Sequence, residues 1–279
     1  YAMLGDCWFS YPFNLFPYGD ITSDDCLKGG SGTTDTGYHP FEIWSTLTAT
    51  TPGEMDELWY RLYCAVSRCN RALVSLERNG VAKLGSDISE QRIAEVKFLR
   101  AHFYYKLLTV FRQVPWIDEV AYLNNSIEQI PNDEFSYEGL FGKVIADFET
   151  AYNVLPEKQS DGGRVNKIAA AAYLAKCYLG LAWGDGYEAT TGVNHINEEY
   201  MRKVVIYTDE VANSDYDYLE DFGDIFLPDY KNSKESVFAV QCSDYKDDNT
   251  SFGRANWSNM LNGCCVIHQD AELRACLYD

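Results

Sequence analysis

Carboxylates are the most numerous groups in this sequence that could do chemistry. The chain carries 42 Asp and Glu residues, and a glycoside hydrolase needs only two of them, on opposite sides of a sugar. Asp24 and Asp25 form one adjacent pair, and Asp247 and Asp248 form another. Because neighbours in a loop rarely face each other across a cleft, neither pair predicts hydrolysis.

The other residue types used in catalysis lack the spacing that their chemistry needs. The segment GGSG at Gly29–Gly32 does not have the spacing of a serine nucleophile elbow, and GDG at Gly184–Gly186 lacks the third glycine of a dinucleotide-binding loop. The histidines, too, lack the spacing of paired zinc ligands: His39, His102, His195 and His268. We therefore expect no catalytic residues. His102 lies in an aromatic helical stretch, where a packed or half-exposed histidine is expected.

Metal and disulfide chemistry have weak support. The nine cysteines form no CxxC pair, and we expect most of them to be free, buried thiols, with one or two disulfides such as Cys7–Cys26 as the alternative. Two Asp-rich stretches, SDYDYLEDFGD and DYKDDN, offer oxygen ligands for calcium without the spacing of an EF-hand. We expect no cofactor, and calcium remains the alternative.

The charge balance excludes two classes of partner. The chain has 279 residues, with 23 basic against 42 acidic side chains, which gives a net charge of −19. Such a surface repels a phosphate backbone and anionic lipid head groups. The longest apolar stretch, Ile168–Trp183, is shorter than the roughly 20 residues of a membrane-spanning helix. The sequence therefore predicts no nucleic-acid partner and no membrane span.

The periodicity of apolar residues predicts a series of helices. Thr51-Pro52-Gly53-Glu54 has the pattern of a capping box, and apolar residues then recur at steps of three and four until Asn79-Gly80. A second helix is expected to begin near Asp87 and to end before Pro115, and Asn166 is expected to cap the fourth. The expected helices cover about residues 51–80, 87–114, 137–155, 167–183 and 198–213.

The order of these elements predicts the fold class and the organisation of the chain. Repeated helical hairpins indicate an all-α, tetratricopeptide-like scaffold with long irregular loops and minor β structure. We expect one domain over residues 1–279, divided into a loop-rich region 1–50, helical repeats 51–214 and an irregular insertion 215–279. A strand is expected at Ser236–Cys242. The tail cannot bury itself well, so we expect the chain to be incomplete at its C-terminal end.

Aromatic residues outside the helices are the best binding candidates. Sugar C–H faces stack on aromatic rings, while Asp and Asn side chains take the hydroxyl groups. Loop aromatics are therefore suited to a carbohydrate-binding surface. The aromatic residues outside the helices include Tyr38, Phe41 and Trp44 before the first long helix, and Tyr245, Phe252 and Trp257 in the tail. Four of these rings, those of Tyr38, Trp44, Tyr245 and Trp257, are the ligand-binding candidates.

Several segments, in order along the chain, resemble hallmark blocks of the SusD/RagB family, the surface nutrient-binding lipoproteins of the Bacteroidetes. The most specific is Glu95–Tyr105 followed by Val114-Pro115, and the others are ELWYRLYCAVSRCNRAL, ADFETAYNVLP, GGRVNKIAAAAYLAKCYLG, YLEDFGDIFLP and KESVFAVQ. The chain departs from the family pattern in places. Arg112 or Gln113 stands where a glycine is expected, and Cys7 is internal and cannot be the lipidated cysteine.

The resemblance implies a non-catalytic protein on the surface of the outer membrane. Family members capture an oligosaccharide and deliver it to a TonB-dependent SusC-like transporter, and they are held at the membrane by a lipid anchor. We expect this anchor to lie outside the given sequence. The loop before the first long helix lies where the family often places part of its site, which adds two acids to the four rings. The candidate ligand residues are thus Asp24, Asp25, Tyr38, Trp44, Tyr245 and Trp257.

Two other functions remain as alternatives. The RagB branch of the family serves peptide uptake, and helical hairpin grooves commonly hold peptides, so a peptide binder or a protein-interaction scaffold is the first alternative. A glycoside hydrolase is the second and the less favoured. Neither the glycan nor its exact contacts follow from the sequence.

Overall fold

The computed structural model describes residues 1–4, 18–23, 25, 39–45, 53–124, 127–184, 187–188 and 192–241. The chain divides into two compact units, Tyr1–Cys64 with Cys242–Asp279, and Ala65–Gln241. Each unit is described by itself.

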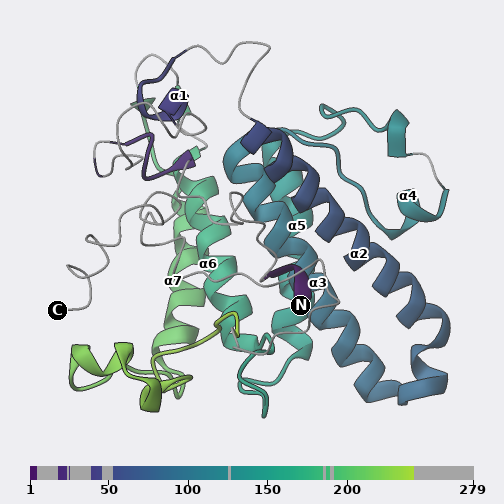
Figure 1. The fold of residues 1–279 in the computed structure, drawn as a ribbon, viewed down its shortest axis with the longest axis vertical. Coiled ribbons are helices and arrows are strands. Elements are labelled where there is room, and N and C mark those ends of the chain that lie inside the picture. The colour runs from purple at the N-terminus through teal and green to yellow at the C-terminus, as the bar shows by residue number, and fades with distance from the viewer. Residues whose placement is uncertain are drawn as a thin grey trace, which may run out of the picture. The chain divides into compact units, whose positions relative to one another are not determined.

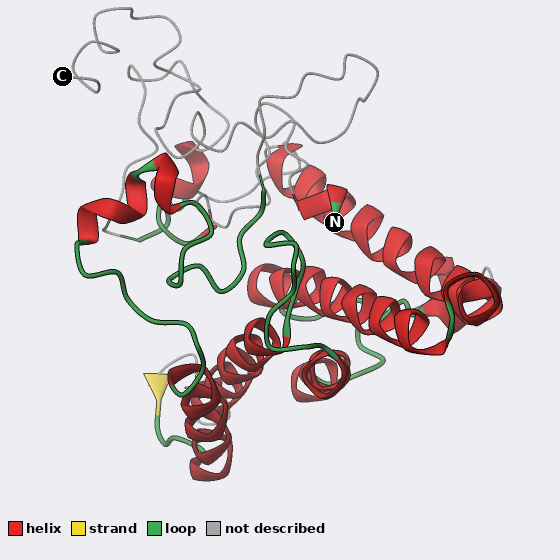
Figure 2. Cartoon of the chain, turned by 90° about the horizontal axis from the view of Figure 1, so that it is seen from below, coloured by secondary structure: helices red, strands yellow, loops and turns green. Residues whose placement is uncertain are grey.

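The described regular structure is almost entirely helical, which confirms the predicted all-α class (Figures 1 and 2). Within the described residues, β structure is limited to Tyr187–Glu188 (β1), which pairs antiparallel with Gly192–Val193 (β2). The short elements are α1 (His39–Glu42), α4 (Glu119–Asn124) and the 3-10 helices Ala2–Leu4, Ile127–Gln129, Phe222–Phe226 and Pro228–Tyr230. The long helices are α2 (Gly53–Leu84), α3 (Ser86–Phe111), α5 (Tyr137–Val154), α6 (Lys167–Gly184) and α7 (Glu198–Ala212).

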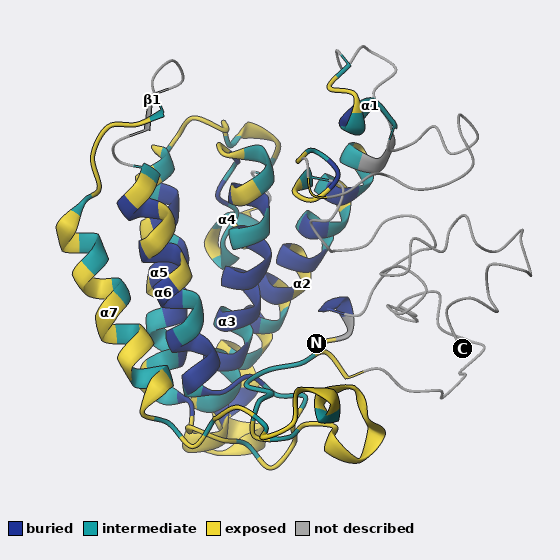
Figure 3. Cartoon of the chain, turned by 90° about the vertical axis from the view of Figure 1, so that its left-hand side faces the viewer, coloured by how far each residue is buried: buried dark blue, intermediate teal, exposed yellow. Residues whose placement is uncertain are grey.

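The helices of the second unit pack in sequence order, α3 against α5, α5 against α6 and α6 against α7. Buried residues concentrate on α3, α5 and α6 (Figure 3). The alanines of α6 let its neighbours approach closely, and Ala169, Ala170 and Ala171 are all buried. Leu99 and Phe103 of α3 are buried as expected. Within the described residues, no helix has the length and apolarity to cross a bilayer.

Tyrosines join the outermost helix α7 to this core. Tyr207 of α7 stacks on Tyr178 of α6 with ring centroids 5.9 Å apart, and it meets Tyr152 of α5 edge to face at 5.5 Å. None of the α7 residues is fully buried, and Tyr207 contacts the core through the buried ring of Tyr178 and the half-buried ring of Tyr152. A substantial part of the tyrosine content therefore serves packing, because a phenol can bury its ring and still keep its hydroxyl near water.

The hairpin of α2 and α3 differs from the prediction at its turn. We expected Gly80 to end the first helix, but α2 continues to Leu84 and the break falls at Gly85, where φ is 84°. Only glycine takes this backbone conformation without strain. Ser86 then begins α3 directly. Thr51 and Pro52 of the expected capping box lie outside the described residues.

Gly80 is instead required by a close approach between the two helices. A Cβ atom at this position would lie 2.2 Å from Oγ and 3.3 Å from Cβ of Ser89 on α3. Ser89 is buried, and among the described residues its Oγ is the buried side-chain oxygen that has no hydrogen-bond partner. The glycine thus allows the helices to meet at their closed end.

We predict that Gly80→Ala lowers the free energy of unfolding by about 1 to 3 kcal/mol, because overpacking outweighs the gain in helix propensity. The double variant Gly80→Ala/Ser89→Ala should recover most of this loss. Denaturant titration followed by circular dichroism measures both. Gly142→Ala on α5 is the matched control, since a Cβ there meets nothing within 4 Å, and it should be neutral or stabilising. A Gly80→Ala variant as stable as Gly142→Ala would contradict the close approach.

Arg112 caps the end of α3, at a position where the family resemblance led us to expect a glycine. Arg112 has φ 63° and ψ −68°, and the N–H of Gln113 donates to the carbonyl of Phe111 at 2.7 Å. These values define a γ-turn of the rare, strained kind, which glycine would adopt more easily. The guanidinium of Arg112 lies over the ring of Tyr137, 4.7 Å from its centroid, and this cation–π contact offsets part of the strain.

The strand expected at Ser236–Cys242 is wrong for the residues that the structure describes, since 236–241 are irregular. Side-chain contacts, rather than a β ladder, hold this segment. The carbonyl of Val237 accepts a hydrogen bond from Nδ2 of Asn166 at 2.9 Å, and Phe238 packs edge to face on Phe98 at 5.7 Å.

Three cysteines lie in the described residues, and all three are free thiols: Cys64, Cys69 and Cys177. Cys69 and Cys177 are buried, as expected of small apolar side chains. Burial raises the pKa of the Cys69 thiol to about 12, so it is not a reactive nucleophile. The alternative disulfide between Cys7 and Cys26 lies outside the described residues.

Candidate ligand-binding surface

Two of the six candidate ligand residues lie in the part of the chain that the structure describes. Asp25 and Trp44 are both exposed. Among the described residues, no hydrogen bond, ion pair or ring contact joins them. Asp24, Tyr38, Tyr245 and Trp257 lie outside the described residues, so their contribution to a site stays a prediction.

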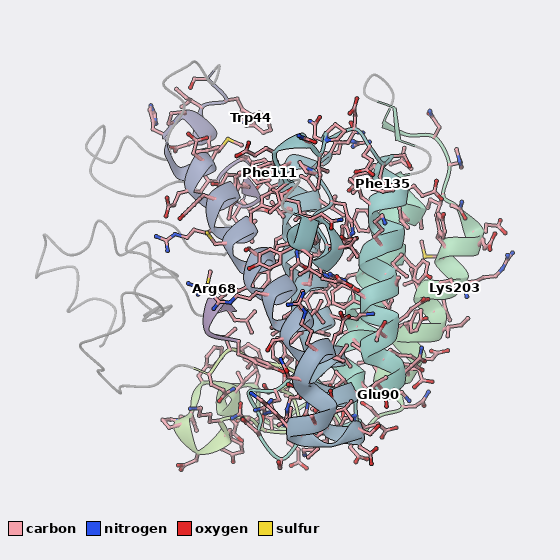
Figure 4. All side chains as sticks on the ribbon, turned by 90° about the vertical axis from the view of Figure 1, so that its right-hand side faces the viewer. Trp44, Arg68, Glu90, Phe111, Phe135 and Lys203 are labelled. Carbon is pink, nitrogen blue, oxygen red and sulfur yellow. The ribbon has the colours of Figure 1, made fainter. Side chains whose placement is uncertain are left out.

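Trp44 follows α1 and is held with its ring in solvent (Figure 4). Its side chain is 76% exposed and its φ is 50°. An exposed tryptophan forgoes the burial that normally stabilises it, and a positive φ adds strain for any residue other than glycine. Trp44 therefore combines an unfavourable exposure with an unfavourable backbone conformation. Strain of this kind clusters at binding sites, where the surrounding structure maintains it.

The neighbours of Trp44 fix this geometry. Phe41 was expected to be an exposed loop aromatic, but it is buried in α1 and meets Tyr18 edge to face at 5.3 Å, so it anchors the short helix instead. The N–H of Trp44 donates to the carbonyl of Phe41 at 3.4 Å, and the N–H of Ser45 donates to that of Pro40 at 3.1 Å. The turn is therefore closed by backbone hydrogen bonds on either side of the exposed ring.

Asp25 lies in a turn whose backbone N–H donates to Oγ of Ser23 at 3.2 Å. Its carboxylate is available to accept hydrogen bonds from hydroxyl groups. Within the described residues, no group of three or more His, Cys, Asp or Glu side chains gathers to hold a metal ion.

The block Glu95–Tyr105 contains charged side chains, but they form a buried polar core. Arg100 of α3 is only 4% exposed, and its Nε and Nη2 donate to the two carboxylate oxygens of Asp147 on α5, at 2.7 and 2.9 Å. Its Nη1 donates to Oδ1 of Asn70 on α2 at 3.0 Å and also to Glu119 of α4. One guanidinium therefore joins four helices.

The same network fixes the chain that follows α3. The Nδ2 of Asn70 donates to the carbonyl of Ile117 at 2.8 Å, and the N–H of Ile117 donates to the hydroxyl of Tyr104 at 2.6 Å. Tyr104 stacks on Trp116 with ring centroids 4.2 Å apart. Burial alone would lower the pKa of Arg100, but the carboxylates of Asp147 and Glu119 reverse this effect and raise it. The guanidinium therefore stays charged inside the protein.

Glu95 forms a second buried ion cluster on α3. It is 1% exposed, and it accepts hydrogen bonds from Arg92 of the same helix and from Nη1 of Arg164 at 2.7 Å. Nε2 of Gln159 also donates to it, at 3.3 Å. Glu95 and Arg100, the two buried charges of the block Glu95–Tyr105, therefore both serve the scaffold.

We predict that Asp147→Asn lowers the free energy of unfolding by about 3 kcal/mol, because the change leaves the charge of Arg100 buried with one fewer counter-charge. Urea titration measures the loss. Glu198→Gln is the matched control. Glu198 pairs with Arg202 at 3.0 Å on the surface of α7, and removing an exposed pair should change stability by less than about 1 kcal/mol. Equal stability of the two variants would contradict the central role of Arg100.

Sequence reasoning missed an aromatic surface on the segment after α7. Tyr218, Phe222 and Phe226 are all strongly exposed, and the rings of Phe222 and Phe226 meet edge to face at 5.4 Å. Asp221 caps this 3-10 helix by accepting from the N–H of Gly223 at 2.7 Å. The acidic residues of this stretch suggested a calcium site. Its unusual feature is instead the strong exposure of its aromatic residues. An element of five residues is too short for a periodic pattern to predict this surface.

The helical hairpins and the buried ion clusters define a tetratricopeptide-like helical scaffold. A SusD-like family model, described as "Starch-binding associating with outer membrane", matches residues 28–179. This match covers more than half of the chain, and the chain therefore belongs to the SusD-like family, as its sequence blocks indicated.

Relatives in two bacteria agree with this assignment. A SusD-like protein of Bacteroides ovatus is 27% identical over 227 residues, which cover 80% of this chain and 40% of the relative. SusD-like protein P2 of Formosa agariphila is 31% identical over 130 residues, which cover 46% of this chain and 24% of the relative. The chain spans less than half the length of these relatives.

Solved structures share the fold. The surface glycan-binding protein A of Bacteroides thetaiotaomicron, solved in complex with laminarihexaose, matches with a TM-score of 0.67 at 22% identity, over 87% of this chain and 48% of that one. A SusD-like protein of Bacteroides fragilis matches with a TM-score of 0.59 at 24% identity, over 77% and 38%. At these identities the likeness shows the fold alone.

Proposed function

We propose that this protein binds an oligosaccharide at the bacterial cell surface and delivers it, without cleaving it, to a TonB-dependent SusC-like transporter. In this proposal the protein is lipid-anchored to the outer membrane. Membership of a family described as starch-binding supports the ligand class, and the laminarihexaose complex of a structural neighbour supports it further. The net charge of −19 favours a neutral glycan over an anionic one.

The observation that carries the proposal is the display of Trp44. Its ring is 76% exposed on a turn closed by backbone hydrogen bonds. A flat, pre-positioned ring can stack on the C–H face of a sugar without losing much conformational entropy on binding. Asp25 and the acids and aromatics of the same loop would supply hydrogen bonds and further contact.

We predict that Trp44→Ala weakens glycan binding by about 1 to 2 kcal/mol, which is roughly a 5- to 30-fold loss of affinity. Affinity electrophoresis on a polysaccharide panel that includes laminarin and xyloglucan identifies the ligand, and calorimetry measures the loss. Trp183→Ala is the matched control, since Trp183 is a half-exposed tryptophan at the end of α6. It should bind like the parent.

Three outcomes would count against the proposal. Unchanged affinity of Trp44→Ala would remove this ring from the site. Binding of a peptide pool in place of every polysaccharide would favour the RagB-like alternative. Release of reducing sugar from the bound polysaccharide would contradict the absence of catalysis.

The proposed transporter partner leads to a separate prediction about the salt dependence of their association. In this proposal the protein covers the transporter, opens to load glycan and closes to deliver it. Such a movement needs a broad, partly polar interface, so the affinity between the two proteins should fall as the salt concentration rises. Pull-down from native outer membranes with the full-length lipoprotein should recover a TonB-dependent barrel, and less of it at high salt. Recovery of the protein alone, from the periplasm or the cytoplasm, would defeat both the localisation and the delivery step.

A further inference from the structure

His102 occupies an unusual position in the core of the second unit. It lies on α3, is 8% exposed, and its Nδ1 is 2.7 Å from the hydroxyl of Tyr173 on α6. The Tyr173 hydroxyl can donate to Nδ1 when the imidazole is neutral. This contact is therefore a direct polar link between the side chains of α3 and α6 that a single proton can change.

The charges around His102 oppose its protonation. Burial lowers its pKa well below the ordinary value, and the positive charges of Lys106 on α3 and Lys176 on α6 lower it further. Lys176 also lies over the ring of Tyr173, 5.4 Å from its centroid. The other titratable ring beside Tyr173 is Tyr105, at 5.8 Å, and burial raises its pKa so that it stays neutral.

Tyr173 connects this pair to the rest of the core. Its ring stacks on Phe148 of α5 at 4.9 Å and meets Phe98 of α3 edge to face at 5.4 Å. Phe98 in turn packs against Phe238 in the segment 233–241 at 5.7 Å. A movement that brings His102 into water must therefore shift Tyr173, and with it the ring cluster that holds this segment.

We propose that the contact between His102 and Tyr173 is an acid-sensitive switch, which loosens α6 and the segment 233–241 from α3 when the imidazole takes up a proton. The direction follows from linkage. In the opened state His102 is solvated and titrates near its ordinary pKa of about 6.5. The neutral, buried form therefore contributes its full stability above this pH and loses it progressively as the pH falls toward the lower pKa of the closed state.

The size of the effect follows from the uptake of one proton. With an opened-state pKa of about 6.5 and a closed state that resists protonation, the opening equilibrium should increase roughly 30-fold between pH 7.5 and pH 5.0, which is the limit set by the uptake of one proton. The increase should be confined to α6 and residues 233–241. Helix α2 serves as the internal reference.

Hydrogen–deuterium exchange with mass spectrometry tests the switch, with protection factors corrected for the pH dependence of intrinsic exchange. The parent should lose protection in α6 and in residues 233–241 about 30-fold between these pH values, and His102→Asn should lose less than threefold. His195→Asn, which changes an exposed histidine, should respond like the parent.

Three results would overturn the switch. One is an equal response of His102→Asn and the parent, and another is a uniform loss of protection that includes α2. The third result needs no variant. It is a pKa of 6.5 or above for His102 in an NMR titration of the parent protein. Because this titration uses the unaltered protein, the inference stays testable even if His102→Asn does not fold.

Discussion

The buried charge of Arg100 is the constraint on which the helical scaffold depends. A guanidinium inside a protein must find partners for its donors, and here Asp147, Asn70 and Glu119 supply them from three other helices. Apolar packing alone would allow α2, α3, α4 and α5 to slide along one another. The planar guanidinium, with its donors in fixed directions, specifies one register of these helices. The hydroxyl of Tyr104 and the amide of Asn70 also fix the backbone at Ile117.

This arrangement places the buried ion clusters and the proposed binding residue Trp44 in different units of the chain. The ion clusters of Arg100 and Glu95 lie inside the second unit, whereas Trp44 stands on a short turn of the first. A scaffold that owes its geometry to buried ion pairs can keep its fold while its loops change. Exposed loop residues can therefore vary with the ligand without a cost in the core.

Much of the fold could be predicted because long helices leave a strong periodic signal. The bounds of α5, α6 and α7 agree closely with expectation, and Asn166 caps α6 by accepting from the N–H of Ala169 at 2.8 Å. The extent of α2 could not be predicted, because a glycine reads as a helix end whether it closes a turn or admits a neighbouring helix. The exposure of Trp44 followed from its place in a loop. Its positive φ did not, since no local pattern encodes it.

Asn166 has a consequence for the order in which the protein assembles. Its Oδ1 caps α6, while its Nδ2 donates to the hydroxyl of Tyr216 at 3.0 Å and to the carbonyl of Val237 at 2.9 Å. The amide is oriented only once the first turn of α6 exists, so its two hydrogen bonds to the segment after α7 cannot form before then. Contacts that close loops of 50 and 71 residues are also slow to form. This segment should therefore be the last part of the second unit to dock during folding.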